Sequence, residues 1–295
     1  MSIPLRIGFQ GELGAFSEEA IQQLWGGDVT AVPFREFRDV ADALSHGEVD
    51  RGVLPIENTI VGSVQVAHDV IDGTPGIHAI AETVVAVHHC LLGPPGAKFD
   101  LVKDVFSHPV ALAQCGIFFR ANPRLTVHAV YDTAGAAVDV SNLADPGFAA
   151  VASRNSARRY NLDVLVPDIE DRPDNQTRFL AFSRMPMPLP VGTPARTMLL
   201  LTTRDVPGAL LEALSPLARH GVNVRRIETR PTGEPWSYRF FVEFDHEVGD
   251  TAADAMVKEI GLLANDVRLV GTYPRFAAGR RGSIGWRSSE FPIVD

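Results

Sequence analysis

A proline-rich segment at residues 185–195 limits the architecture of this 295-residue chain more than any other feature. It holds four prolines, Pro186, Pro188, Pro190 and Pro194. Each proline fixes φ and removes a backbone donor, so the segment favours an extended linker over a helix or a central strand. We therefore expect a first folded unit at residues 1–184 and a second at residues 196–274. The Gly-, Arg- and Ser-rich tail at residues 275–295 is expected to be disordered.

The first unit alternates apolar runs typical of strands with amphipathic stretches typical of helices. The strand-like runs lie at residues 5–9, 52–54, 78–92, 105–106, 127–130, 149–152 and 180–182. The helical stretches lie at residues 16–25, 37–44 and 133–140 and in a segment beginning near Pro109. This alternation predicts an α/β fold, in which ligands bind where strands end and helices begin.

The second unit shows a shorter pattern of the same kind. Strands are expected at residues 197–202, 222–229, 238–244 and 268–272, and helices at residues 207–220 and 251–263. The order is βαββαβ, which is the ferredoxin-like arrangement.

Composition excludes several classes of protein. The net charge of -9 argues against nucleic acid or an anionic membrane as a partner. The two cysteines, Cys90 and Cys115, are too few and too far apart for a zinc site or a disulfide framework, and we expect buried thiols. The first residues lack a signal-peptide pattern, and no apolar run is long enough to span a bilayer. A cytoplasmic location is therefore expected.

The most informative short segment is residues 174–180, where Thr177 and Arg178 precede a short apolar run. A hydroxyl can donate a hydrogen bond to a departing oxygen, and an arginine can clamp a carboxylate. The pair therefore suits chemistry on a small dianionic acid. The alternative is an ordinary turn with a surface arginine, because short motifs are weak evidence alone.

Five further segments occur with residues 177–179 in a characteristic order. They lie at residues 8–18, 53–64, 107–115, 208–210 and 228–231. Together they resemble prephenate dehydratase followed by an ACT regulatory domain, and the resemblance covers residues 4–274. It implies a two-lobed catalytic domain with a cleft, similar to periplasmic binding proteins. It also implies removal of water and carbon dioxide from prephenate, giving phenylpyruvate in phenylalanine biosynthesis.

This chemistry requires no cofactor, because the ring becomes aromatic and so drives the reaction. We found no phosphate-binding loop or metal-ligand cluster in the sequence, and we expect neither a metal nor an organic cofactor. The enzyme must instead hold two carboxylates, help hydroxide to leave and exclude water.

The resemblance assigns Thr177 as the essential residue, donating a hydrogen bond to the leaving oxygen. The other expected catalytic residues are Glu57, Asn58, Ser107, Gln114 and Arg178. Glu57 is expected to organise neighbouring donors or to store a proton, since a free carboxylate would repel the substrate. Ser107 could instead cap the following helix. Arg178 could face away from Thr177 and form a structural ion pair, because adjacent strand residues point to opposite faces.

Substrate binding is expected at Gly14, Ala15, Thr59 and Ser63. The glycine loop before residue 16 could be a site of close approach for an anion, or simply a tight turn. His108 is a less favoured candidate acid.

The second unit is expected to bind phenylalanine as an effector. The residues assigned to this site are Gly208, Ala209, Leu210, Asn223, Glu228, Thr229, Arg230 and Pro231. Thr229 stands where the family usually has serine. The resemblance implies that phenylalanine binds between ACT domains of different subunits, so a homodimer or homotetramer is expected. The linker would transmit domain movement, and removal of the second unit would leave an unregulated enzyme.

Two other functions fit parts of the sequence. A non-catalytic solute-binding module would share the two-lobed fold, and arogenate dehydratase would perform the same elimination on the aminated substrate. No chorismate mutase module is expected ahead of the first motif, since only seven residues precede Gly8.

Overall fold

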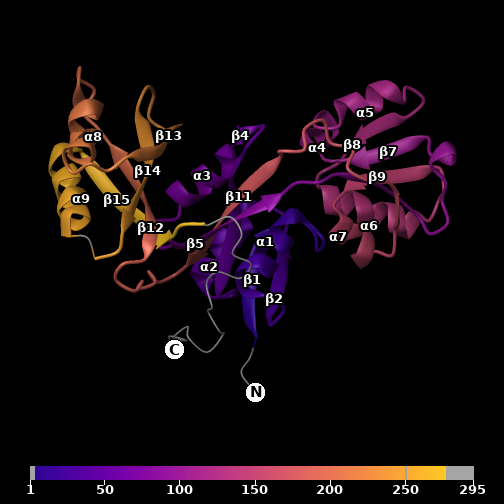
Figure 1. Cartoon of the computed structure of the whole chain (residues 1–295), viewed down its shortest axis with the longest axis horizontal. Coiled ribbons are helices and arrows are strands. Elements are labelled where there is room, and N and C mark those ends of the chain that lie inside the picture. Colours follow the sequence, from indigo (N-terminus) through magenta and orange to yellow (C-terminus); the bar gives the residue numbers. More distant parts are fainter. Residues whose placement is uncertain (1–3, 250, 277–295) are drawn as a thin grey trace.

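The computed structural model describes residues 4–249 and 251–276, apart from the side chains at 251–254, and contains three β-sheets. The three sheets follow one another along the longest axis of the molecule (Figure 1). Most of the tail, from residue 277, lies outside the described residues, so the expected disorder is untested there. No helix in the described ranges is long and apolar enough to cross a membrane.

The first lobe is built on a mixed sheet with the strand order β2-β1-β3-β11-β5. Its strands are β1 (Leu5–Gln10), β2 (Val29–Phe34), β3 (Arg51–Asn58), β4 (Gly62–Ser63), β5 (His78–Ala86) and β11 (Gln176–Ser183). Its helices are α1 (Phe16–Trp25), α2 (Phe37–His46) and α3 (Gln65–Asp72). The short strand β4 pairs only with β3, and β11 lies between β3 and β5.

The second lobe has a sheet with the order β10-β6-β9-β7-β8. Its strands are β6 (Cys90–Gly93), β7 (Asp104–Ser107), β8 (Thr126–Ala129), β9 (Phe148–Ala152) and β10 (Asp163–Val166). Its helices are η1 (Phe99–Leu101), α4 (Pro109–Ala113), α5 (Gly116–Ala121), α6 (Thr133–Leu143) and α7 (Arg154–Arg159). The chain enters this lobe after β5 and returns to the first lobe at β11, so two connections cross between the lobes (Figure 1). This topology confirms the expected two-lobed fold.

The third sheet has the order β13-β14-β12-β15 and belongs to the second unit. Its elements are β12 (Pro194–Thr202), α8 (Ala209–Arg219), β13 (Val224–Pro231), β14 (Tyr238–Glu247), α9 (Thr251–Leu263) and β15 (Asp266–Pro274). The βαββαβ order is as expected. Helices α8 and α9 cover one face of the sheet, where Leu199, Leu217 and Ile260 belong to one buried cluster.

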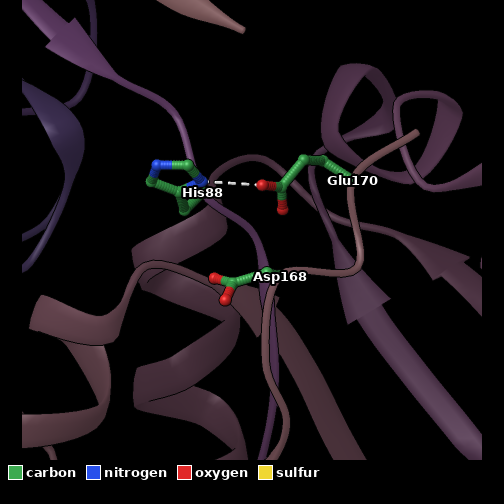
Figure 2. Close-up of side chains that lie close together, drawn as sticks. All are labelled: His88, Asp168 and Glu170. Carbon is green, nitrogen blue, oxygen red and sulfur yellow. Dashed lines mark hydrogen bonds and ion pairs between the residues drawn. The ribbon is translucent and has the colours of Figure 1, made fainter. Parts of the chain in front are cut away.

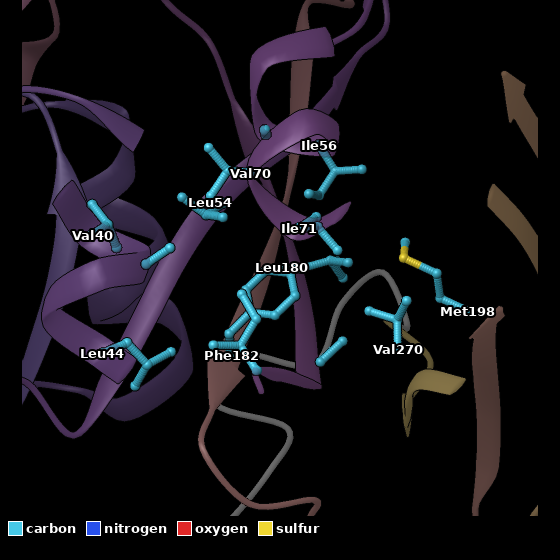
Figure 3. Packing of buried hydrophobic residues seen from close by; sticks show 14 of the residues in the cluster. Val40, Leu44, Leu54, Ile56, Val70, Ile71, Leu180, Phe182, Met198 and Val270 are labelled. Carbon is cyan, nitrogen blue, oxygen red and sulfur yellow. The ribbon is translucent and has the colours of Figure 1, made fainter. Parts of the chain in front are cut away.

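The other face of the third sheet packs against the first lobe. A single buried cluster joins Met198 and Val270 of this sheet to Ile71 and Leu180 of the lobe (Figure 3). At Gly271 the approach is so close that an added Cβ would lie 2.1 Å from the carbonyl oxygen of Ala79 in β5. The sheet is therefore docked on the first lobe through a shared hydrophobic core rather than tethered by the linker alone.

Candidate active site

Asn58, at the end of β3, has a side-chain amide whose orientation is determined by the backbone. Its Oδ1 accepts hydrogen bonds from the N–H groups of Ile60 and Val61, at 2.9 and 3.0 Å. The amide nitrogen must therefore point the other way. It donates to Oγ1 of Thr177 at 2.9 Å and to Oδ1 of Asn175 at 2.8 Å.

Thr177 consequently accepts a hydrogen bond and keeps its own proton for another acceptor. Within the described part of the chain, no acceptor for that proton lies within hydrogen-bonding distance. The side chain is half-buried at the start of β11. Its hydroxyl is thus arranged as a hydrogen-bond donor to a ligand.

The network continues from Asn175 into the second lobe. Asn175 is fully buried and donates to Oε1 of Gln114 at 3.1 Å. The same oxygen lies 3.0 Å from Nε2 of His89, so His89 carries its proton on Nε2. Since Oε1 receives both bonds, the amide nitrogen of Gln114 is directed elsewhere and can serve a ligand.

His89 is held neutral by its surroundings. Burial lowers the pKa of its imidazole. Its Nδ1 is buried and finds no hydrogen-bond partner among the described residues. His89 and Asn175 were both absent from the predicted site residues. Asn175 lies inside the informative segment at residues 174–180, whereas the position of His89 depends on the crossing between the lobes.

Thr59 supports this arrangement from the end of β3. Its Oγ1 donates to the carbonyl oxygen of Asp174 at 3.0 Å and accepts from the N–H of Gln176 at 2.9 Å. It therefore holds the segment that carries Asn175 and Thr177 beside Asn58. Its observed role is structural support of the network.

In the predicted anion loop at Gly14 and Ala15, the backbone groups of Gly14 are already hydrogen-bonded to other residues of the protein. The N–H of Gly14 donates to the carboxylate of Glu18 at 2.5 Å, and its carbonyl oxygen accepts from Ser153 and Ser156. Gly14 has φ of +95°, and an added Cβ would lie 3.0 Å from Ser156. The loop therefore joins the two lobes through a close approach that favours glycine.

The N-terminus of α1 follows directly and has open backbone donors. Within the described residues, the N–H groups of Phe16 and Ser17 have no hydrogen-bond acceptor. The ring of Phe16 meets His89 edge to face, with 5.8 Å between centroids. This helix end, with its partial positive charge, thus lies beside the network.

Three predicted cleft residues are engaged elsewhere. Ser107 is buried and donates to the carbonyl oxygen of Val151 at 2.6 Å; it does not cap α4, whose N-cap is His108. Ser63 donates to Glu228 of the third sheet. Arg178 forms a two-pronged bond with Glu243 of that sheet, at 2.7 and 2.8 Å.

Glu57 also faces the third sheet, as its carboxylate lies 3.6 Å from Nε of Arg226 in β13 and 3.3 Å from Arg178. It contacts neither Thr177 nor Asn58 through its side chain in the described structure. The structure therefore brings Thr177, Asn58 and Gln114 together and leaves Glu57, Arg178, Ser63 and Ser107 outside this network.

The crossing between the lobes also brings together His88, Asp168 and Glu170, which sequence spacing did not reveal (Figure 2). Their ligand atoms lie within 4.8 Å of one another, as in a metal site. Each carboxylate already has protein partners, however. Glu170 binds His88 Nδ1 at 2.7 Å and the N–H of His89 at 2.9 Å. Nη2 of Arg154 donates to both carboxylate oxygens of Asp168. We interpret the group as support for the crossing strands.

The predicted effector residues divide between two faces of the third sheet. On β13, Glu228 and Arg230 face the first lobe, where Arg230 binds Asp69 at 2.7 Å. The exposed Thr229 alternates with them and points away. Gly208 caps α8 with φ of +85° and has open space around it. The remaining members are Ala209, which is buried, Leu210, which is half-buried, and Asn223 and Pro231, which are exposed.

Comparison with known proteins agrees with these observations. Residues 7–187 match the prephenate dehydratase family, and residues 197–261 match the ACT domain. Arogenate dehydratase 2 of Petunia hybrida is 36% identical over 287 residues, covering 92% of this chain and 72% of the relative.

Two solved structures are also similar. One is the prephenate dehydratase of Arthrobacter aurescens in complex with L-Phe, with 30% identity, a TM-score of 0.84 and coverage of 92% of this chain and 90% of the other. The second, described as a novel type of quorum-quenching acylase, has 32% identity, a TM-score of 0.84 and coverage of 93% and 100%. The chain belongs to the prephenate dehydratase family and carries a C-terminal ACT domain.

Proposed function

We propose that this protein is a prephenate dehydratase, which converts prephenate to phenylpyruvate, water and carbon dioxide. The observation that carries the proposal is the fixed amide of Asn58. Because that amide donates to Thr177, the Thr177 hydroxyl is left to donate to an oxygen of the substrate. A preorganised donor of this kind stabilises the charge that develops on a leaving hydroxide.

The elimination can be assigned to groups of the site. The bonding pair of the ring carboxylate enters the ring as carbon dioxide leaves. The C–O bond breaks at the opposite ring carbon, and the oxygen departs as hydroxide, hydrogen-bonded by Thr177, and becomes water on protonation. A threonine hydroxyl is too weak an acid to be consumed in this step, so its role is donation rather than permanent proton transfer.

Two sets of donors are available for the substrate carboxylates. The first is the free amide nitrogen of Gln114. The second is the N-terminus of α1, where the N–H groups of Phe16 and Ser17 lack acceptors among the described residues. Helix N-termini favour bound carboxylates through both hydrogen bonding and the helix dipole.

The network supports prephenate over arogenate as the substrate. Its side chains are the amides of Asn58, Asn175 and Gln114, the hydroxyl of Thr177 and the neutral imidazole of His89. None of them carries the negative charge that would pair with the ammonium group of arogenate.

Acyl hydrolysis is the competing activity, since a related structure is described as an acylase. A nucleophilic threonine requires a base that removes its proton. Thr177 instead receives a hydrogen bond from Asn58, and no base contacts its hydroxyl in the described residues. This geometry supports a donor rather than a nucleophile.

Initial rates with prephenate, arogenate and an N-acyl homoserine lactone would separate these activities. We expect kcat/KM to be highest for prephenate and to fall in Thr177→Ala with that substrate. Preferred turnover of arogenate would reassign the substrate. Turnover of the lactone alone, or binding of prephenate without turnover, would refute the proposed dehydratase.

We further propose a cytoplasmic homodimer or homotetramer that is inhibited by phenylalanine. Support comes from the match to the ACT domain and from the related structure in complex with L-Phe. Leu211, Leu262 and Trp236 of the second unit are 76, 86 and 87% exposed and are available for contacts between subunits. Light scattering with and without phenylalanine tests this assembly. A monomer at all concentrations would contradict it.

A further inference from the structure

Strands β3 and β11 carry two neighbouring rows of residues with different surroundings. Thr177 pairs with Asn58, and Arg178 pairs with Glu57 in the next row. Side chains directly opposite each other share a face, whereas successive residues on a strand point to opposite faces. The first row therefore belongs to the active-site network and the second faces away from it.

The second row is bound by the third sheet. The two terminal nitrogens of Arg178, Nη1 and Nη2, donate to the carboxylate of Glu243 in β14, at 2.7 and 2.8 Å. The side chain of Glu243 is completely buried, and that of Arg178 is 11% exposed. A two-pronged ion pair fixes the relative geometry of its partners, and removing one partner of a buried pair leaves an uncompensated charge.

The row extends to β4, where Ser63 pairs with Glu57. Arg226 of β13 contacts both: its Nη2 donates to Ser63 Oγ at 2.5 Å, and its Nε lies 3.6 Å from Glu57. Ser63 also donates to Glu228, a member of the predicted effector motif. Three adjacent strand ends of the catalytic lobe are thus held by side chains of the regulatory sheet.

The pairing of β11 with β3 has an irregularity at this point. Its register shifts between Arg178 and Phe179, so that Phe179 pairs with Pro55. A bulge interrupts the ladder of backbone hydrogen bonds and loosens the local restraint on the strand. On the β5 side the pairing is regular here, with Thr177 opposite Val85 and Arg178 opposite Val84, so the contacts of Arg178 act on the side where the pairing with β3 is interrupted.

We propose that Arg178 and Glu243 are positioning residues for the elimination, with Glu243 of the regulatory sheet holding Thr177 in place through Arg178. The inference rests on the proposed dehydratase activity. Neither residue touches the substrate. Their effect is on the geometry of the Thr177 donor, and hence on the rate of the chemical step more than on substrate affinity.

The test is Glu243→Gln in the full-length protein, assayed with prephenate. The amide keeps the shape of the side chain and removes its charge. Glu259→Gln is the matched control, because Glu259 of α9 binds Arg219 and His220 of its own domain. We expect kcat to fall about 10- to 100-fold in Glu243→Gln, as for a misplaced catalytic group, with KM changed less than about twofold. The control should keep both constants.

Phenylalanine gives a second measurement. In Glu243→Gln we expect calorimetry to show that phenylalanine still binds, while its effect on kcat is reduced. Wild-type kcat together with an unchanged phenylalanine response would overturn the inference. A rise in KM at unchanged kcat would do so as well, since it would place Glu243 in substrate binding.

The double variant Arg178→Gln/Glu243→Gln covers the possibility that the single variant unfolds. It removes both charges of the pair together, which is less harmful than leaving one buried charge alone. If the residues act through each other, the double variant should lose no more kcat than the more affected single variant. Multiplied losses, or normal kcat in the double variant, would contradict the proposal. Absence of turnover in the wild type would instead refute the proposed function.

Discussion

Gly271→Ala tests whether docking of the third sheet on the catalytic lobe contributes to stability. The new Cβ would lie 2.1 Å from the oxygen, 2.8 Å from the nitrogen and 2.9 Å from the carbonyl carbon of Ala79. Carbon and oxygen atoms normally approach no closer than about 3.3 Å, so β15 must move by about 1 Å. Because these atoms are backbone in two strands, no side-chain rotation relieves the contact.

The expected cost is about 3 kcal/mol of the free energy of unfolding, at the upper end of the range for overpacking. Glu243 lies on β14, which is joined to β15 through β12. A shift of the whole sheet by the same amount would stretch the 2.7 Å contact of Arg178 with Glu243 to about 3.7 Å, beyond hydrogen-bonding distance. We therefore expect a lower kcat in addition to lower stability.

Urea denaturation and initial rates are the measurements, with Gly261→Ala as the matched control. Gly261 lies in α9, and nothing lies within 4 Å of its added Cβ. Alanine there should stabilise the helix by about 0.5–1 kcal/mol. If Gly271→Ala left the free energy of unfolding within about 0.5 kcal/mol of the wild type, the close packing of β15 on β5 would not hold in solution.

Four further outcomes are expected. Thr177→Ala should reduce kcat by ~100- to 1,000-fold and Thr177→Ser should retain more activity, whereas equal losses would indicate packing by the methyl group. Burial disfavours the charged form of the Glu243 carboxylate, but the charge of Arg178 outweighs this effect and lowers the pKa of Glu243 in the folded protein. The ionised carboxylate therefore contributes fully to stability above about pH 4.3, the pKa of an unperturbed glutamate, and this contribution is lost as the pH falls through the folded-state pKa. The difference in unfolding free energy between wild type and Glu243→Gln should shrink across that range, and a constant difference down to pH 3 would contradict the assignment. Chelation with EDTA should leave turnover unchanged, and its loss with recovery on adding a divalent ion would make the cluster around Glu170 a metal site. Truncation after Pro190 should give a destabilised, aggregating lobe, contrary to the sequence-based expectation of an active unregulated enzyme; a folded, fully active product would support that earlier expectation.

Most helices and strands were predicted correctly, because hydrophobic periodicity and helix-ending residues are read from neighbouring positions in the chain. Helix α1 spans Phe16–Trp25, as its periodicity indicated, and α2 ends at Gly47, which adopts the left-handed conformation typical of a helix end. Strand β2 was missed, since it contains Pro33 and lies at the edge of its sheet. Helix α3 was also missed, because its buried face is completed by the distant third sheet.

The active-site network was only partly predictable for a related reason. Thr177 and Asn58 stand out as polar residues at strand ends, and the resemblance assigned them directly. The contribution of Asn175 and His89 depends on Gln114, which reaches them across the two connections between the lobes. No spacing along the chain shows this contact.

The strand period explains why the predicted site residues separate into two groups. A motif such as Thr177-Arg178 places one side chain on each face of β11, and the paired residues Asn58 and Glu57 do the same on β3. The sequence alone did not show which face of the sheet would contact the substrate, or which part of the protein would pack against the opposite face. For Arg178, the partner on the other face is the third sheet, because the completely buried side chain of Glu243 binds it there. We therefore expect Arg178 to affect the reaction without contacting the substrate, because it holds the strand that carries Thr177 from the opposite face.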